Sequence, residues 1–172
     1  MTSKYFFYGT LSHPALLERV LGHLPALVPA RAEGWEVRHA LASDGDELSF
    51  PVLVPGPAGV TGVLAEIAPE GARRLDFYET WYVTAEIAVT DAAGAVAQAR
   101  VYLPEPGRWQ PGRPWALADW VEQWGEIAPE AAAEFMALQG QVPAEQALAR
   151  YGNIKVRAAS RLRARDGGPA TR

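Results

Sequence analysis

Residues 4–14 read KYFFYGTLSHP, a short apolar run with aromatic side chains that leads into a Gly-Thr turn. The apolar run favours a β-strand. Glycine permits backbone paths that other residues resist, so Gly9 and Thr10 favour a tight turn after that strand. Such a turn can present backbone N–H groups to a ligand, and we expect an anion or amide cradle there. A plain β-turn with a hydrogen-bonded Thr10 is the alternative.

Downstream of this turn, short strand patterns recur without the regular alternation of strand and helix that a doubly wound sheet requires. Gly62 lies inside the run VTGVLAEI and indicates a bulge or a close backbone approach. One helix is predicted over 13–20 and another from Pro69 to Glu79. We expect an α+β fold, a small mixed or antiparallel β-barrel with flanking helices. Strands are predicted at 4–8, 50–54, 60–67, 81–90 and 96–103, with mixed strand and turn signals over 27–42.

The character of the chain changes after Pro104. Residues 104–114 are rich in Pro and Gly and are typical of a linker. Helices follow at 115–124, 129–138 and 143–150, and the tryptophans of the first are more often core residues than a ligand platform. We predict a barrel domain at 1–104, a C-terminal helical extension packed on it at 105–150, and a basic tail or linker at 151–172.

Composition excludes several classes of function. The 172 residues, 49% apolar and 21% charged, suffice for one domain with a buried core. The absence of cysteine excludes disulfides, thiolate metal sites and a cysteine nucleophile. No apolar run approaches ~20 residues, and the N-terminus lacks a small-residue cleavage site. We therefore expect no membrane span, no signal peptide and a cytoplasmic location.

Charge is distributed unevenly along the chain. Residues 150–172 contain seven basic residues and one acidic residue, whereas residues 1–149 contain nine basic and nineteen acidic ones. An acidic body disfavours nucleic acid as the main partner. The basic end could contact phosphate, but a solvated tail or an interdomain linker is the more common structure for such a charge run.

Glu79 is the strongest candidate for chemistry. It closes the predicted helix just before a strand, and Phe77, Tyr78, Trp81 and Tyr82 around it are aromatic. Aromatic rings remove water from a carboxylate, which raises its pKa from about 4.3 toward neutrality. A carboxylate with such a pKa can take and return a proton at neutral pH. A solvated glutamate at a helix end is the alternative.

Other polar patterns carry less chemistry. Asp76 shares a helix face with Glu79, a pair that could bind metal or tune a pKa, but a surface group paired with Arg73 or a local cap is more common. Ser12 and His13 could suggest a hydrolase, yet adjacent residues rarely face each other and no nucleophile elbow is present. The three histidines lack metal-ligand spacing. We therefore expect no metal site, and the sequence contains no P-loop or dinucleotide-binding fingerprint.

Several segments together resemble the gamma-glutamylcyclotransferase-like (AIG2-like) family over residues 4–104. The segments FFYGTL, FPVLV, VTGVLAEI, RRLDFYE and ARVYLP match it in order and spacing. The resemblance implies a small mixed β-barrel that cyclises a γ-glutamyl group to 5-oxoproline, releases the attached amine and uses no cofactor. It also implies Glu79 as catalytic acid/base. Further site residues implied by it are Tyr8, Gly9, Thr10 and Leu11 as the substrate loop, and Tyr82 and Tyr102 as pocket walls.

Two positions depart from the family pattern. Thr80 stands where many members have glycine, and Thr84 stands where many have arginine, so a charged substrate clamp is missing. The segments after residue 114 resemble those that join such domains to a Nudix hydrolase in some bacterial fusion proteins. The expected partner is a small γ-glutamyl substrate, and the sequence leaves room for a homodimer or a functional link to a Nudix hydrolase. A non-catalytic small-molecule binding or regulatory module of the same fold is the alternative function.

Overall fold

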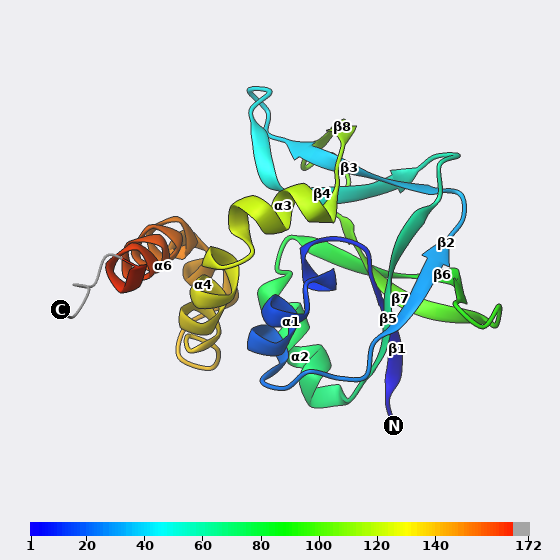
Figure 1. Cartoon of the computed structure of the whole chain (residues 1–172), viewed down its shortest axis with the longest axis horizontal. Helices are drawn as coiled ribbons and strands as arrows, with labels where there is room; N and C mark the ends of the chain where they lie inside the picture. Colours follow the sequence, from blue (N-terminus) through cyan, green and yellow to red (C-terminus); the bar gives the residue numbers. More distant parts are fainter. Residues whose placement is uncertain (167–172) are drawn as a thin grey trace.

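A closed five-stranded barrel organises the computed structural model, which describes residues 1–166 (Figure 1). Neighbouring strands are antiparallel except where β7 meets β1 in parallel, at Tyr5 and Arg100, and closes the barrel. The expected mixed barrel is therefore confirmed. In order around the barrel the strands are β1 (Ser3–Phe7), β5 (Val60–Ile67), β2 (Val28–Ala32), β6 (Tyr82–Asp91) and β7 (Val96–Pro104).

A second sheet lies beside the barrel, in the upper part of Figure 1. It contains β4 (Glu47–Pro55), β3 (Trp35–Leu41) and β8 (Gln110–Pro114), in that order. The prediction of a linker over 104–114 was wrong for residues 110–114, which pair antiparallel with β3. Pro111 and Pro114 hide this strand from sequence patterns, but an edge strand tolerates proline because one side of it needs no hydrogen-bond donors.

Alternating burial shows why the barrel strands form. On β6 the side chains of Ile87 and Val89 are buried, while the residues between and beside them are exposed. Gly62 on β5 faces the end of β1, and a side chain there would collide with the Phe7 carbonyl. The predicted close backbone approach at Gly62 is confirmed.

Helices cover one side of the barrel. In α1 (Pro14–Leu21) the buried residues include Leu16, Leu17 and Val20, and Gly22 ends the helix with a positive φ of 84°. Helix α1 packs against α4 (Ile127–Met136) and α2 (Pro69–Tyr78). The remaining helices are the short 3₁₀ turn η1 (Thr10–Ser12), α3 (Leu117–Trp124), α5 (Ala144–Ala149) and α6 (Tyr151–Asp166).

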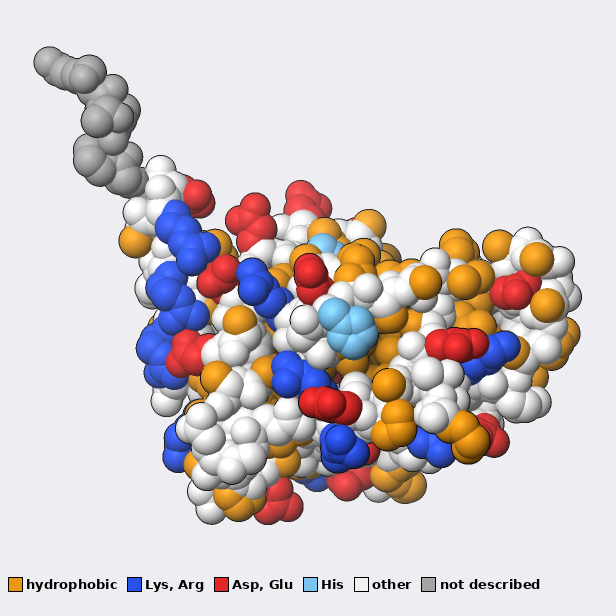
Figure 2. Space-filling view, turned by 90° about the horizontal axis from the view of Figure 1, so that it is seen from below, with side chains coloured by type: hydrophobic (Ala, Val, Ile, Leu, Met, Phe, Trp, Pro, Cys, Tyr) orange, Lys and Arg blue, Asp and Glu red, His pale blue; other side chains and the backbone are white. Residues whose placement is uncertain are grey.

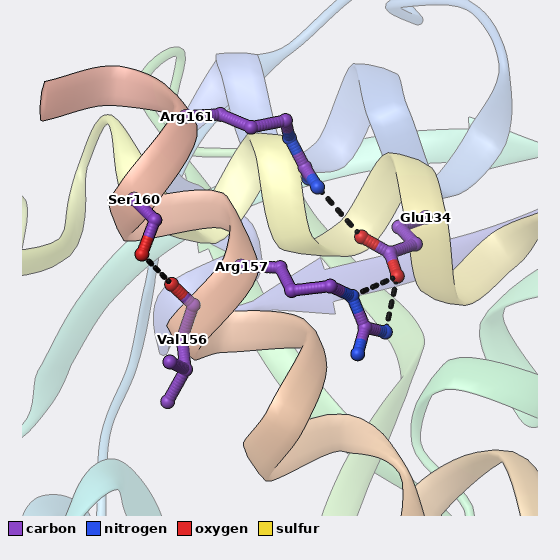
Figure 3. A network of polar contacts seen from close by, with 5 residues as sticks. All are labelled: Glu134, Val156, Arg157, Ser160 and Arg161. Atoms are coloured by element: carbon purple, nitrogen blue, oxygen red, sulfur yellow. Dashed lines mark hydrogen bonds and ion pairs between the residues drawn. The ribbon is translucent and has the colours of Figure 1, made fainter. Parts of the chain in front are cut away.

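The segment predicted as a basic tail or linker forms α6 over residues 151–166, so that prediction was wrong there. Ile154 and Ala158, four residues apart, are buried in the core. On the neighbouring helix α4, Glu134 accepts hydrogen bonds from Arg157 and Arg161 (Figure 3). Helix α6 therefore buries only two apolar side chains and is otherwise held by ion pairs. It lacks the wide apolar stripe by which sequence patterns detect a packed helix.

Two glutamates of α4 thus pair with three of the arginines that sequence analysis assigned to a basic tail. Arg165 pairs with Glu130 at 3.3 Å, and Figure 2 shows basic side chains beside acidic ones along the edge that carries the C-terminal end of α6. Residues 167–172 of the predicted tail lie outside the described residues. The domain boundaries at 104 and 150 stay predictions. Within residues 1–166, every helix is too short or too polar to cross a membrane.

Gly62→Ala tests the contact between β1 and β5. A Cβ at this position would lie 2.2 Å from the Phe7 carbonyl oxygen and 2.9 Å from the Phe6 ring. The strands must separate to admit it, so we expect the free energy of unfolding to fall by about 1–3 kcal/mol, measured by urea denaturation. Gly152→Ala is the control, because open space surrounds a Cβ there and alanine favours a helix by up to about 1 kcal/mol. Equal stability of Gly62→Ala and wild type would contradict the close approach.

Candidate active site

A cavity of about 320 Å³ lies where the end of β1, the turn between α2 and β6, and the C-terminal helices meet. This volume suits a small organic ligand. Every site residue expected from the sequence lines it, although these residues come from distant parts of the chain. They are Tyr8, Gly9, Thr10, Leu11, Glu79, Tyr82 and Tyr102.

The loop after β1 is held tightly in place. Gly9 is buried, and a Cβ there would lie 2.8 Å from the Pro51 ring, so only glycine fits. The Ser12 N–H donates to the Gly9 carbonyl at 2.9 Å, and the Ser12 hydroxyl donates to the Phe7 carbonyl at 2.7 Å. Within residues 1–166, the N–H groups of residues 9–11 have no hydrogen-bond acceptor. These donors are therefore available to a ligand.

Glu79 lies at the C-terminal end of α2, as the sequence predicted. Its N–H donates to the Leu75 carbonyl at 2.8 Å, and its own carbonyl accepts from the Tyr82 N–H at 2.8 Å, so the backbone is anchored on both sides. The side chain is partly buried in the cavity wall, and within residues 1–166 it forms no ion pair. Burial raises the pKa of Glu79 to about 8, because the charged form loses its water. The carboxyl group can therefore take up and release a proton near neutral pH.

Tyr8 and Tyr82, which line the cavity with Glu79, are held in place by their hydroxyl groups. The Tyr8 hydroxyl donates to the Tyr102 carbonyl at 2.8 Å, and the Tyr82 hydroxyl donates to the Pro51 carbonyl at 2.9 Å. Burial, with smaller contributions from neighbouring charges, raises the pKa of both phenols well above 10, so they stay neutral donors. The rings therefore form a rigid wall of low polarity around the carboxyl group.

Asp76 has a different partner from the one predicted. Its Oδ1 accepts a hydrogen bond from the Tyr102 hydroxyl at 2.7 Å. The expectation that it pairs with Arg73 or caps the helix was wrong, because a ring from β7 reaches over α2, which local sequence cannot show. Burial, more than this hydrogen bond, raises the pKa of Tyr102. Asp76 thus orients one wall of the cavity.

The Ser12–His13 hydrolase hypothesis has no support in the structure. The Ser12 hydroxyl is used by the Phe7 carbonyl, and His13 Nε2 lies 3.1 Å from the Gly125 carbonyl. Neither side chain lines the cavity. The two side chains instead hold the turn against the end of β1 and the C-terminal end of α3.

Several aromatic residues of the cavity wall were not predicted from the sequence. Trp109, from the predicted linker, packs against Phe50 at 4.9 Å and Tyr82 at 5.2 Å between ring centroids. Trp120 is a buried core residue, as expected, but it also lines the cavity together with Trp124. The only sequence signal was the density of tryptophans over 109–124, which a hydrophobic core explains equally well.

The C-terminal helix also reaches the cavity. Tyr151, Gly152 and Lys155 of α6 line it, and the Tyr151 hydroxyl lies 3.3 Å from that of Tyr78.

Thr80 lines the cavity and donates its hydroxyl to the Phe77 carbonyl at 2.8 Å, whereas Thr84 is exposed and does not line it. Among residues 1–166, no group of three His, Cys, Asp or Glu side chains is arranged to hold a metal ion.

Comparison with known proteins identifies relatives of this fold. The model of the family described as "Gamma-glutamyl cyclotransferase, AIG2-like" matches residues 5–122. No curated protein matches the chain. A solved structure titled "Gamma-glutamyl cyclotransferase" shares 17% identity at a TM-score of 0.57, covering 73% of this chain and 81% of that one.

Two further solved structures show the same fold. An uncharacterized protein from Homo sapiens has a TM-score of 0.56 and 16% identity, covering 71% of this chain and 79% of its own. A protein from Arabidopsis thaliana has a TM-score of 0.56 and 18% identity, covering 83% of this chain and 86% of its own. At these identities the likeness establishes the fold alone.

The raised pKa of Glu79 predicts a specific pH dependence of stability. Between the unfolded value near 4.5 and the folded value of about 8, the folded protein keeps a proton that the unfolded chain has released. The free energy of unfolding therefore falls as the pH rises through this window, by at most about 1.4 kcal/mol per pH unit, and this effect is constant above it. Since glutamine carries no such proton, Glu79→Gln should gain stability relative to wild type from about pH 5 to 8.

Urea denaturation across that pH range measures the difference. Glu122→Gln, at an exposed position outside the cavity, provides the baseline for the same chemical change. A difference between wild type and Glu79→Gln that does not change with pH would show that burial does not hold the proton on Glu79.

Proposed function

Because the chain belongs to the AIG2-like gamma-glutamyl cyclotransferase family, we propose that it cyclises a γ-glutamyl group to 5-oxoproline and releases the attached amine, with Glu79 as general acid/base. Family membership by itself indicates a cyclotransferase-type activity. The observation that carries the finer proposal is that one cavity is lined by Glu79 and by residues 9–11, whose N–H groups have no acceptor among residues 1–166.

The proposed reaction needs a base but no nucleophile from the protein. The substrate's own α-amine attacks its γ-carbonyl carbon, and a new C–N bond closes the five-membered ring. Glu79 accepts the proton that the ammonium group loses. The tetrahedral intermediate then expels the leaving amine as the original C–N bond breaks, and Glu79 returns the proton to that nitrogen. Bonds and protons balance, and Glu79 regains its starting state.

The loop after β1 supplies the second requirement, which is stabilisation of negative charge. The γ-carbonyl oxygen becomes an oxyanion as the amine attacks it. Backbone N–H groups of residues 9–11 are held rigidly by Pro51 and by the Ser12 hydrogen bonds, so they need no rearrangement. A preorganised donor of this kind contributes about 3–4 kcal/mol to the transition state in a comparable hydrolase.

Aromatic walls supply the third requirement, which is a restricted site that contains little water. A flexible γ-glutamyl chain must fold back so that its amine meets its carbonyl, and a confined cavity lowers the entropic cost of that geometry. Along one wall, Phe50 packs edge to face against Tyr82 and Trp109, whose own rings are tilted by 44° to each other. Low local polarity also keeps the pKa of Glu79 in the range that proton transfer needs.

The non-catalytic alternative gains no support from the site. A binding module with this fold would be indicated by Glu79 turned to bulk solvent or by a filled cavity. Glu79 instead lines an open cavity with the loop donors. The cytoplasmic location, the homodimer and the link to a Nudix hydrolase stay predictions from the sequence.

Glu79→Gln tests the proposed acid/base. The amide cannot accept the ammonium proton, so we expect kcat/KM to fall by about 10²- to 10⁴-fold in 5-oxoproline release from a panel of γ-glutamyl amino acids and amines. The wild-type rate should rise with pH through an apparent pKa of about 8, as Glu79 becomes the carboxylate. Glu122→Gln should retain activity. Failure of wild type to release 5-oxoproline from any member of the panel would rule out this function.

Gly9→Ala tests the loop geometry. A Cβ at residue 9 would lie 2.8 Å from Pro51 Cγ, so the loop must move and carry its N–H groups out of place. A displacement of about 1 Å costs up to about 100-fold in rate, and we expect a loss of that order in kcat/KM. The double variant Gly9→Ala/Pro51→Ala removes the obstructing ring atoms and should recover part of the activity. Full activity of Gly9→Ala alone would show that the loop does not need this position.

A further inference from the structure

A single strongly basic side chain lines the cavity. Of the residues that line it, all within 1–166, Lys155 is the only lysine or arginine and Glu79 is the only carboxylate. Lys155 belongs to α6, which lies beyond the residues that the family model matches. The cavity wall therefore includes a cation that the matched region does not supply.

The Lys155 ammonium group has few partners of its own. Its Nζ lies 3.4 Å from the Ser49 hydroxyl and 4.8 Å from the centroid of the Trp124 ring. Within residues 1–166 it forms no ion pair. Burial lowers the pKa of Lys155, because the charged form loses water without gaining an anion. A ligand that brought an anionic group would replace that lost solvation.

The rest of α6 holds Lys155 toward the cavity. Arg157 and Arg161 are paired with Glu134 of α4 (Figure 3). Arg165 is paired with Glu130 of the same helix. These arginines have carboxylate partners, whereas Lys155 has none in the part of the chain that the structure describes. The ion pairs of the arginines thus hold α6 against α4, while Lys155 lines the cavity and can bind a ligand.

Glu79 is not the missing anion. The two side chains form no ion pair, and burial alone accounts for the raised pKa of Glu79, which a nearby cation would lower. The cavity therefore contains two separate ionisable groups, the Glu79 carboxyl group, which takes up a proton, and the positively charged Lys155 ammonium group. A γ-glutamyl substrate carries an ammonium group and an α-carboxylate, and a γ-glutamyl amino acid carries a second carboxylate on its leaving amine.

We propose that Lys155 binds a carboxylate of the substrate, so that α6 supplies a positive group to the wall of the cavity. An ammonium on a half-buried stem beside Trp124 presents charge and an apolar surface together, which suits a carboxylate attached to a carbon chain. The identity of the substrate rests on the proposed cyclotransferase function.

Three substrates of matched size distinguish the two carboxylates. They are γ-glutamyl-alanine, γ-glutamyl-ethylamide, which lacks the carboxylate of the leaving amine, and γ-glutamyl-alanine with its α-carboxylate converted to the carboxamide. Lys155→Met keeps the stem but removes the charge, and we expect kcat/KM for γ-glutamyl-alanine to fall about 10- to 100-fold. For the analogue that lacks the carboxylate bound by Lys155, the same variant should differ from wild type by less than about twofold.

Further variants separate recognition from structure. Lys155→Arg keeps the charge and should retain more activity than Lys155→Met. Arg163→Met removes a positive charge from an exposed position of the same helix and should leave all three rates unchanged. Equal losses in Lys155→Met for all three substrates, or no loss for any, would overturn the proposal. Thermal unfolding of each variant shows whether α6 stays folded.

Binding keeps the test independent of turnover. Trp124 lies beside Lys155, so its fluorescence should report occupation of the cavity. In the Glu79→Gln background, we expect Lys155→Met to weaken the Kd for γ-glutamyl-alanine about tenfold or more. An unchanged Kd would overturn the role of Lys155. Absence of 5-oxoproline from wild type, with this binding difference intact, would overturn only the proposed reaction.

Discussion

One carboxyl group held among aromatic rings is the constraint on which the site depends. Among the described residues, Glu79 has no paired cation to offset its burial, so the protein keeps it protonated well above its ordinary pKa. That state costs stability as the pH rises, and it persists because the backbone of Glu79 is tied on both sides to α2 and β6. The hydroxyl groups of Tyr8, Tyr82 and Tyr102 each donate to a protein acceptor, which fixes their rings in the wall of the same cavity.

Closure of the barrel turns this single group into a two-part site. β1 pairs with β5 on one side and with β7 on the other, which fixes the turn at Gly9 relative to the rest of the barrel. The turn between α2 and β6 then places Glu79 at the same cavity, about 70 residues later in the chain. Pro51, from the second sheet, touches both halves, since its ring limits Gly9 and its carbonyl holds Tyr82. The acid/base and the loop donors therefore depend on one rigid framework.

The C-terminal helices are packed on the barrel and form part of the same framework. Trp124 and Lys155 reach the cavity from α3 and α6, and ion pairs from Glu134 hold α6 in place. Exposed pairs of this kind contribute little stability individually, about 0–1 kcal/mol each. Their main effect is on orientation, because they settle which face of a sparsely apolar helix turns inward. A region outside the matched family residues thereby changes the charge inside the cavity.

Local patterns in the sequence were sufficient for the elements that follow local rules. Strand β1, its glycine turn and the close approach at Gly62 were predictable, because a short aromatic run and an interior glycine have direct backbone consequences. The place of Glu79 at a helix end among aromatic residues was predictable for the same reason. Strand β8 and helix α6 were not, since prolines hide the first and charges hide the second, and each forms only against a partner distant in sequence. The Asp76–Tyr102 hydrogen bond and the cavity faces of Trp109 and Lys155 likewise exist only after the chain has closed. Short-range backbone preference is encoded residue by residue, whereas the partner of a side chain depends on packing between segments far apart in sequence.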